Sequence, residues 1–127
     1  VFESHAVEIE GRAIQVRGEC DDVVFFDFTD ICKTARSQTD YMEIAQLYHA
    51  VIISNVEQMG RHNDDVARRF IALVDEFYER RVKLILSAQQ PIDMLYSEGQ
   101  LSFEFRRCVS RLQEMQSEEY LALAHRA

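Results

Sequence analysis

The sequence contains no tryptophan, a single proline and only four glycines among its 127 residues. The glycines stand apart from one another, so no G-x-x-x-x-G-K-[ST] loop is present to cradle the phosphates of a nucleotide. The longest apolar runs, such as residues 50–53, are far too short to cross a bilayer, and the first residues lack a basic-then-apolar signal pattern. We therefore expect neither a phosphate-binding loop nor a membrane span in this chain.

Cysteine and histidine are also sparse. Cys20, Cys32 and Cys108 are far apart and form no C-x-x-C pair, which excludes a disulfide framework and a zinc knuckle and favours a reducing cytoplasm. The four histidines do not fall at metal-ligand spacing with one another or beside a suitable cysteine or carboxylate, so no metal site is expected. No serine or cysteine lies in a recognisable nucleophile motif, so no catalytic residue is assigned.

The formal net charge of -8 argues against nucleic acid as a partner, because a polyanion is repelled unless a local basic stripe overrides the net field. An apolar content of 47% is enough for one sizeable core, which predicts a single domain over residues 1–127. The chain begins on Val1 rather than methionine, and both Val1 and Phe2 are apolar. We interpret it as a piece of a longer polypeptide.

The first third of the chain has the period of β-structure. Apolar and polar residues alternate on both sides of Gly11, which predicts a β-hairpin over residues 6–17. The β-branched and aromatic run at residues 23–28 predicts a third strand. Thr29 is expected to cap a short helical turn that ends at Cys32.

The middle of the chain alternates between helix and strand patterns. Cap-forming side chains precede a helical repeat at residues 41–48, and the apolar run at 50–54 fits a parallel strand covered on both faces. An apolar stripe at helical spacing predicts a helix that begins at Asn63 or Asp64 and extends through Phe77. With another strand at 82–87, this predicts a β-α-β crossover unit.

The last third is expected to be helical, with a short helix from Pro91 through Tyr96, a longer one over residues 103–116 and a final one capped by Ser117. The predicted fold is therefore α/β, with α+β as the alternative: a β-hairpin plus a β-α-β crossover unit with C-terminal helices.

Two short strings are similar to parts of ATPase sites. Residues 70–76 match the apolar run and Asp-Glu of a Walker B strand, but their apolar positions keep a helical period, which favours a solvated helix end for Asp75 and Glu76. Residues 51–55 are similar to a strand whose terminal polar residue senses a phosphate, although Asn55 is more simply a turn former.

The arginines are the more informative residues. Arg107 and Arg111 share a helix face at i, i+4 spacing and have the fork geometry that grips a phosphate or carboxylates. Two adjacent cations repel unless an anion compensates, and a salt-bridge network with nearby acidic residues is the alternative. The acidic residues expected in such a network are Glu104, Glu114 and Glu118. Arg68 and Arg69 form a second pair at the start of the apolar helix.

Five sequence blocks, in this order and spacing, form a specific signature. They are F-x-F-x-x-I-C at 26–32, R-S-x-x-D-Y at 36–41, A-R-R-F-I-x-L-V-D-E-F-Y at 67–78, V-K-L-I-x-S-A at 82–88 and F-x-F-x-R-x-x-S-R-L-x-E-M-Q-S-x-x-Y-L at 103–121. Over residues 2 to 125 the chain resembles the C-terminal portion of the ZapE-type (Afg-one-like) P-loop ATPases of the AAA-plus superfamily.

The resemblance implies a full-length ATPase that uses ATP and magnesium, with its P-loop core upstream of this region. This region alone is then expected to be inactive and to bind neither ligand. The resemblance implies Arg107, with Arg111 second, as candidates for nucleotide contact, and Arg68 and Arg69 as candidates for contact between subunits. It also implies two partners, the upstream core and, in bacteria, the tubulin-like division protein, and it allows oligomers.

Three functional hypotheses follow. In the first, the region is a lid-like domain that couples the nucleotide state of the ATPase to a protein partner. In the second, it is an interaction module that binds its partner without nucleotide and offers the hairpin at 6–17 as an edge. In the third, it is a free-standing enzyme, which only unassigned polar residues favour.

Overall fold

The computed structural model describes residues 5–127, so Val1 and Phe2, on which the interpretation as a piece of a longer polypeptide rested, lie outside the described residues. The described chain begins with the predicted hairpin, formed by strands β1 (His5–Ile9) and β2 (Arg12–Val16). Its turn requires positive φ at both central residues, 52° at Glu10 and 75° at Gly11, which explains the glycine there. The two strands form a sheet of their own.

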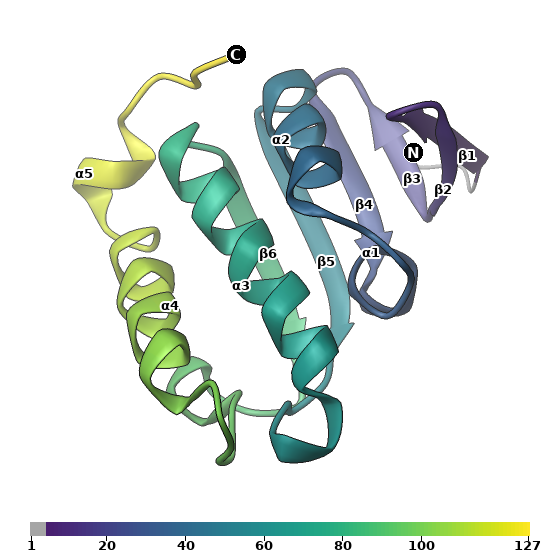
Figure 1. Ribbon diagram of the computed structural model, residues 1–127. Coiled ribbons are helices and arrows are strands. Elements are labelled where there is room, and N and C mark those ends of the chain that lie inside the picture. Colours follow the sequence, from purple (N-terminus) through teal and green to yellow (C-terminus); the bar gives the residue numbers. More distant parts are fainter. Residues whose placement is uncertain (1–4) are drawn as a thin grey trace.

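The main sheet has four strands in the order β3-β4-β5-β6 (Figure 1). Strands β4 (Val23–Asp27), β5 (Ala50–Val56) and β6 (Lys83–Ala88) are mutually parallel. The parallel pair of β5 and β6 was predicted, whereas the orientation of β4 was not. Strand β3 (Gly18–Cys20) pairs antiparallel with β4 and was missed, because three residues without an alternating apolar pattern carry no strand signal. The α/β class and the crossover unit are confirmed.

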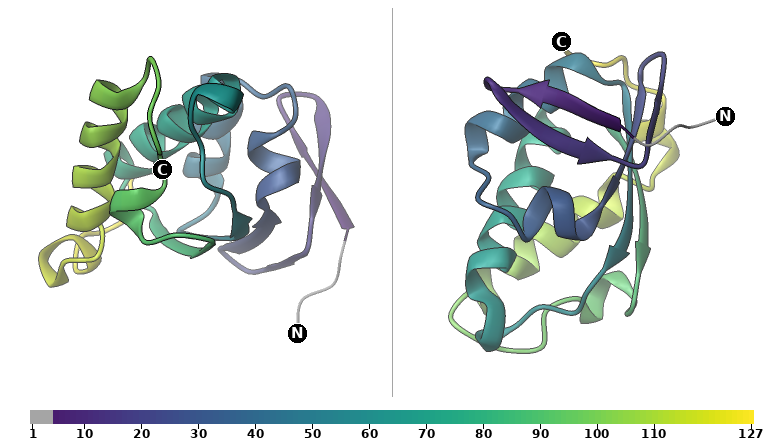
Figure 2. Two further views of the ribbon diagram at one scale, coloured as in Figure 1. Left: turned by 90° about the horizontal axis from the view of Figure 1, so that it is seen from below. Right: turned by 90° about the vertical axis from the view of Figure 1, so that its right-hand side faces the viewer.

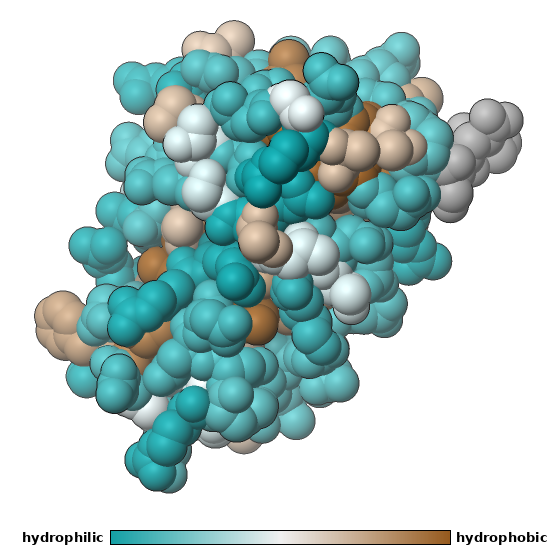
Figure 3. All heavy atoms as spheres, turned by 45° about the vertical axis from the view of Figure 1, so that its right-hand side comes forward, coloured by the Kyte–Doolittle hydropathy of each residue, from teal (hydrophilic) through white to brown (hydrophobic). Residues whose placement is uncertain are grey.

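Two helical connections link the parallel strands. Helices α1 (Phe28–Cys32) and α2 (Gln38–Leu47) lead from β4 to β5, and the 3₁₀ turn η1 (Arg61–Asn63) and helix α3 (Asp64–Glu79) lead from β5 to β6. In both views of Figure 2, helices α1 to α4 lie on the same side of the four-stranded sheet. The outward surfaces of α2 and α3 are largely hydrophilic, as amphipathic helices over a core require (Figure 3).

Helix caps differ from the expected ones at two positions. Asp27, and not Thr29, caps α1, because its carboxylate accepts a hydrogen bond from the Thr29 amide, two residues later, at 3.0 Å. Asn63 occupies the cap position of α3, yet its side chain accepts from the Gly60 amide instead of the helix. Both residues favour turns as well as caps, so their partner depends on the local loop path.

The hydrophobic core lies between the helices and the sheet. Buried aromatic rings from three helices contact one another: Phe28 lies edge-on to Phe70, with ring centroids 6.1 Å apart, and Phe70 stacks on Phe105 at 5.9 Å. Buried Asp40 ties the hairpin to α2, since it accepts from Arg12 at 2.6 Å and from the Ser37 amide at 2.8 Å.

Strand β5 is not covered on both faces by the described residues. Val51 and Ile53, which point toward the helices, are fully buried, whereas Ala50 and Ile52 on the opposite face are only half-buried. The difference arises because all four helices lie on one side of the sheet. The expected second layer is therefore not supplied by residues 5–127.

The C-terminal third contains the 3₁₀ turn η2 (Ile92–Met94), which follows Pro91, and helices α4 (Ser102–Glu114) and α5 (Glu118–Leu121). Ser117 caps α5 as predicted, accepting from the Tyr120 amide at 3.1 Å. The Tyr120 hydroxyl lies within hydrogen-bonding distance of two carbonyls that flank the α3–β6 turn, at Phe77 (3.2 Å) and Val82 (2.8 Å). Helix α5 is thereby fastened to that turn.

Candidate functional site: the arginines of helix α4

Helix α4 forms because apolar residues recur at helical spacing along one stripe. Phe105, Cys108 and Leu112 are buried against α3, and burial raises the pKa of the Cys108 thiol. Arg107 and Arg111 lie beside this stripe, where α4 runs next to α3 (Figure 1). Their guanidinium groups are therefore directed toward the side chains of a neighbouring helix as well as toward solvent.

Both arginines face one carboxylate on α3. Arg111 Nη1 lies 2.5 Å from Asp75 Oδ1, and Arg107 Nη2 lies 3.5 Å from Asp75 Oδ2. Arg111 also lies over the ring of Tyr78, 5.0 Å from its centroid. Asp75 is thus the anion that offsets the repulsion of the two cations. A salt-bridge network was expected, but its predicted acidic members, Glu104, Glu114 and Glu118, are wrong.

The two guanidinium groups differ in availability. The Arg111 side chain is 24% exposed and is held by a short contact, whereas the Arg107 side chain is 60% exposed and has only the longer one. Glu114, expected to join the arginines, instead accepts a hydrogen bond from the Tyr78 hydroxyl at 2.8 Å, and this bond raises the pKa of Tyr78. Of the two arginines predicted to contact nucleotide, Arg107 is therefore the more exposed and the less closely held.

Arg68 and Arg69 also differ in their exposure and in their contacts. Arg69 donates to the Cys32 carbonyl at 3.1 Å and lies 3.8 Å from Asp65, one helical turn earlier. Arg68 is exposed and borders a shallow hollow of about 210 Å³ that Leu101 also lines. Arg69 therefore supports the fold, and Arg68 is the member available for an intermolecular contact.

The ATPase-like strings have structural roles here. Asp75 and Glu76 lie within α3 and not on a strand, as the helical period favoured. The Asn55 side chain donates to Asp27 at 2.6 Å, and its own φ of 62° lies in the left-handed region that asparagine tolerates in turns. Asp75 and Asn55 thus both have side-chain partners within residues 5–127.

An outward cluster on α4 was missed from the sequence. Phe103, 76% exposed, lies beneath the guanidinium of Arg106 at 5.9 Å, and with Arg107 and Ser110 these residues line a hollow of about 390 Å³. The signal was available, because positions 103, 106, 107 and 110 share one helix face. From the sequence alone, Phe103 marks only the start of the predicted helix.

The strand order of the main sheet bears on where a nucleotide could bind. The parallel strands β4, β5 and β6 follow in simple order with helices on one side, so the sheet has no point where strand order reverses, the usual place for a nucleotide. Within residues 5–127 no group of three or more metal-binding side chains is found. His49 and His125, far apart in sequence, lie in contact with their rings tilted by 40° and their centroids 4.4 Å apart.

Comparison with known proteins decides the family. The model of the family described as AFG1-like ATPase matches residues 2–124. The chain belongs to this family. Cell division protein ZapE of Escherichia coli strain K12 is 49% identical over 124 residues, covering 98% of this chain and 33% of that protein. The predicted membership of the ZapE-type ATPases is confirmed.

Eukaryotic relatives of this AFG1-like region are more distant. Lactation elevated protein 1 homolog B of Danio rerio is 29% identical, with 94% of this chain and 30% of that protein covered. An uncharacterized protein of Schizosaccharomyces pombe is also 29% identical, with 91% and 32% covered. The chain thus spans about a third of the length of the curated relatives it matches. No solved structure gives a significant match.

Across residues 5–127, none of the helices is long and apolar enough to cross a bilayer. The three cysteines predicted to be unpaired are free thiols.

Proposed function

We propose that this chain is the coupling domain of a longer, cytoplasmic AFG1-like ATPase, in which a P-loop core outside this region binds ATP and magnesium. The single observation that carries the proposal is the difference between the two arginines that contact Asp75. Arg111 lies close to this carboxylate, whereas the Arg107 side chain is 60% exposed beside it. An exposed guanidinium on a rigid helix suits contact with an anionic group of the core. The family match and the chain's third-length coverage of its relatives support a domain role.

In this proposal the chain itself performs no hydrolysis. It has no glycine-lined phosphate loop, and its one-sided sheet offers no nucleotide crevice within residues 5–127. In this proposal the chain contributes the Arg107 guanidinium at its boundary with the P-loop core, together with a surface that binds a partner. The exposed Arg68 is the better candidate of its pair for contact between subunits, since Arg69 is tied to Cys32.

The test uses a hybrid ATPase, in which this chain replaces the matching region of Escherichia coli ZapE, to which it is 49% identical. Arg107→Ala should lower kcat by about tenfold or more, as expected when a cation that stabilises developing charge is lost. Gln113→Ala, an exposed change on the same helix, is the control. Unchanged kcat in a folded Arg107→Ala hybrid would contradict the role.

A second function is favoured by the outward cluster on α4. Phe103 and Arg106 combine an exposed ring with a cation, the residue types that anchor protein interfaces. We propose that this cluster binds a protein partner without nucleotide, and the name of the relative ZapE points to a division protein, with the bacterial tubulin-like protein as the first to test.

This binding is measured with the 127-residue chain and the purified tubulin-like protein, without nucleotide. The wild-type chain should bind at micromolar concentration, and Phe103→Ala should weaken binding by about tenfold or more, as truncation of an interface anchor does. Gln113→Ala again serves as the control. Absence of binding at micromolar concentration counts against this second function and leaves the ATPase test unaffected.

A further inference from the structure

Strand β6 is an open edge of the main sheet. It ends the strand order, and within residues 5–127 no other strand pairs with its outer side. The opposite edge, β3, has only three residues and includes Gly18 and Glu19, features that discourage pairing. Strand β6 has six residues, none of them buried, and Ile85 is 57% exposed. The two edges are therefore unequally protected.

The composition of β6 belongs to a covered strand. Leu84, Ile85 and Leu86 place apolar side chains on both faces, the pattern of parallel strands that lie inside a structure. Strand β5 has a similar composition, and there Val51 and Ile53 are fully buried. Strand β6 thus has the apolar composition of a buried strand although it lies at the edge of the sheet.

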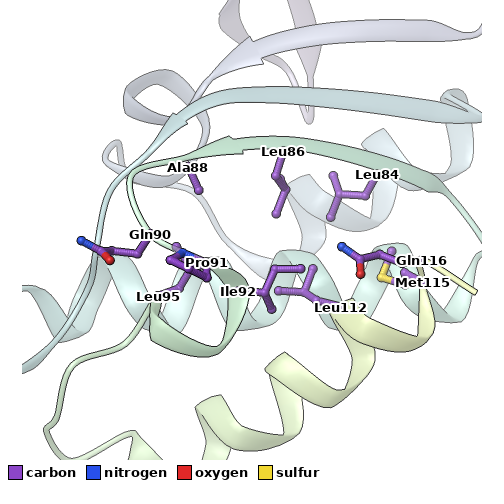
Figure 4. A pocket seen from close by; sticks show the side chains of 10 residues that line it. All are labelled: Leu84, Leu86, Ala88, Gln90, Pro91, Ile92, Leu95, Leu112, Met115 and Gln116. Atoms are coloured by element: carbon purple, nitrogen blue, oxygen red, sulfur yellow. The ribbon is translucent and has the colours of Figure 1, made fainter.

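A cavity lies beside this strand on the helix side. Leu84 and Leu86 point from β6 toward Ile92 and Leu112, and together with Met115 they line a volume of about 250 Å³ (Figure 4). An added strand would find main-chain partners along β6 and an apolar pocket for one of its alternate side chains, the two elements of recognition by strand addition. We call β6 and these cavity residues the β6 edge surface.

The backbone groups available at this surface follow from the pairing. The Lys83 amide donates to the His49 carbonyl at 2.9 Å, so residues 83, 85 and 87 direct their backbone groups toward β5. In a parallel ladder alternate residues face opposite neighbours. Residues 84, 86 and 88 therefore direct their amides and carbonyls to the open edge.

We propose that an extended segment from the rest of the ATPase polypeptide, with apolar side chains at alternate positions, pairs with the β6 edge surface. The occupant is sought in the same polypeptide because the matched region is only 33% of the length of ZapE, and a tethered segment has a high effective concentration at its target. This inference rests on the proposed function only in treating the chain as part of a longer ATPase.

The test is amide hydrogen exchange without nucleotide, in the chain alone and in the hybrid ATPase. Amides of residues 84, 86 and 88 should exchange rapidly in the chain alone and about 100-fold more slowly in the hybrid. Amides of 85 and 87, already bonded to β5, are the internal control and should be protected in both. Ile85→Lys in the hybrid should abolish the added protection.

Three results would overturn the proposal: equal exchange at 84, 86 and 88 in both proteins, protection in the chain alone that rises with its concentration, which indicates a second copy, or full protection in the Ile85→Lys hybrid. If the hybrid does not fold, unmodified ZapE provides the same measurement on its aligned strand. Arg107→Ala in the hybrid should leave this protection unchanged, so failure of the nucleotide role and failure of the strand pairing are separable.

Discussion

The two faces of helix α4 belong to the same thirteen residues but have different surroundings. On the inner face Phe105 stacks between Phe70 and Tyr96, with ring centroids 5.9 and 5.1 Å away. On the outer face Phe103, two residues earlier, is 76% exposed, and the guanidinium of Arg106 lies 5.9 Å from its ring centroid. The inner residues are explained by packing, whereas the outer ones are not. The outer face is therefore where functional constraints should be sought.

The largest expected difference is between the two phenylalanines. Phe105→Ala should lower the free energy of unfolding by about 3–5 kcal/mol, because it leaves a cavity among buried rings. Phe103→Ala should change it by no more than about 0.5 kcal/mol, as surface substitutions do. Urea denaturation of both variants of the chain measures the pair. Similar losses in the two variants would mean that the faces are not distinct.

The arginines should show a smaller difference of the same sign. Arg111→Ala removes the short contact with Asp75 and the packing over Tyr78, and should cost about 1–2 kcal/mol of stability. Arg107→Ala removes one long, exposed contact and should cost no more than about 0.5 kcal/mol. Thermal and urea unfolding of the isolated chain provide the comparison. A greater loss for Arg107→Ala would reverse the assignment of the two residues.

The smallest effect is expected at the edge of the α3–α4 interface. The bond from Tyr78 to Glu114 raises the pKa of Tyr78 above its ordinary value of 10.0 in the folded protein. The contribution of this hydrogen bond to the free energy of unfolding is therefore present below pH 10, and it is lost as the pH rises through the pKa of Tyr78 in the folded protein.

Tyr78→Phe keeps the ring that stacks on Tyr120 but removes the ionisable group. The stability difference between wild type and variant should shrink as pH rises above 10, measured by urea unfolding across that range. A difference that is constant with pH would show that the hydroxyl does not contribute through Glu114.

These contrasts show where prediction from sequence succeeds. The hairpin around Gly11, the stripe of α3 and the cap at Ser117 were found because each depends on residues close together in the chain. Strand β3 was missed because three residues carry too little pattern. The α1 cap was assigned to Thr29 instead of Asp27, an error of two residues at a helix end, where boundaries are least determined.

The sequence predicted which arginines form the candidate site, but it did not predict the carboxylate that they contact. The i, i+4 spacing placed Arg107 and Arg111 on one face, but Asp75 is 36 positions away from Arg111, and only the packing of α3 against α4 brings them together. The sequence does not show how α3 and α4 pack, so the predicted partners were acidic residues close to the arginines in the chain. The exposed face of Phe103 was undetermined for the same reason, since burial depends on neighbours from other elements.

The hydrogen bonds of Tyr120 have a practical consequence for shortened versions of this 127-residue chain. One hydroxyl near the end of the chain contacts carbonyls on both sides of the turn that leads into β6. Removing residues 117–127 would take away the Tyr120 hydroxyl and leave the Val82 carbonyl without this donor, whereas the Phe77 carbonyl would still accept from the Val82 amide at 3.0 Å. Proteolytic nicking after Gln116 should have the same outcome, loosening the start of the outermost strand while the remaining helices stay folded.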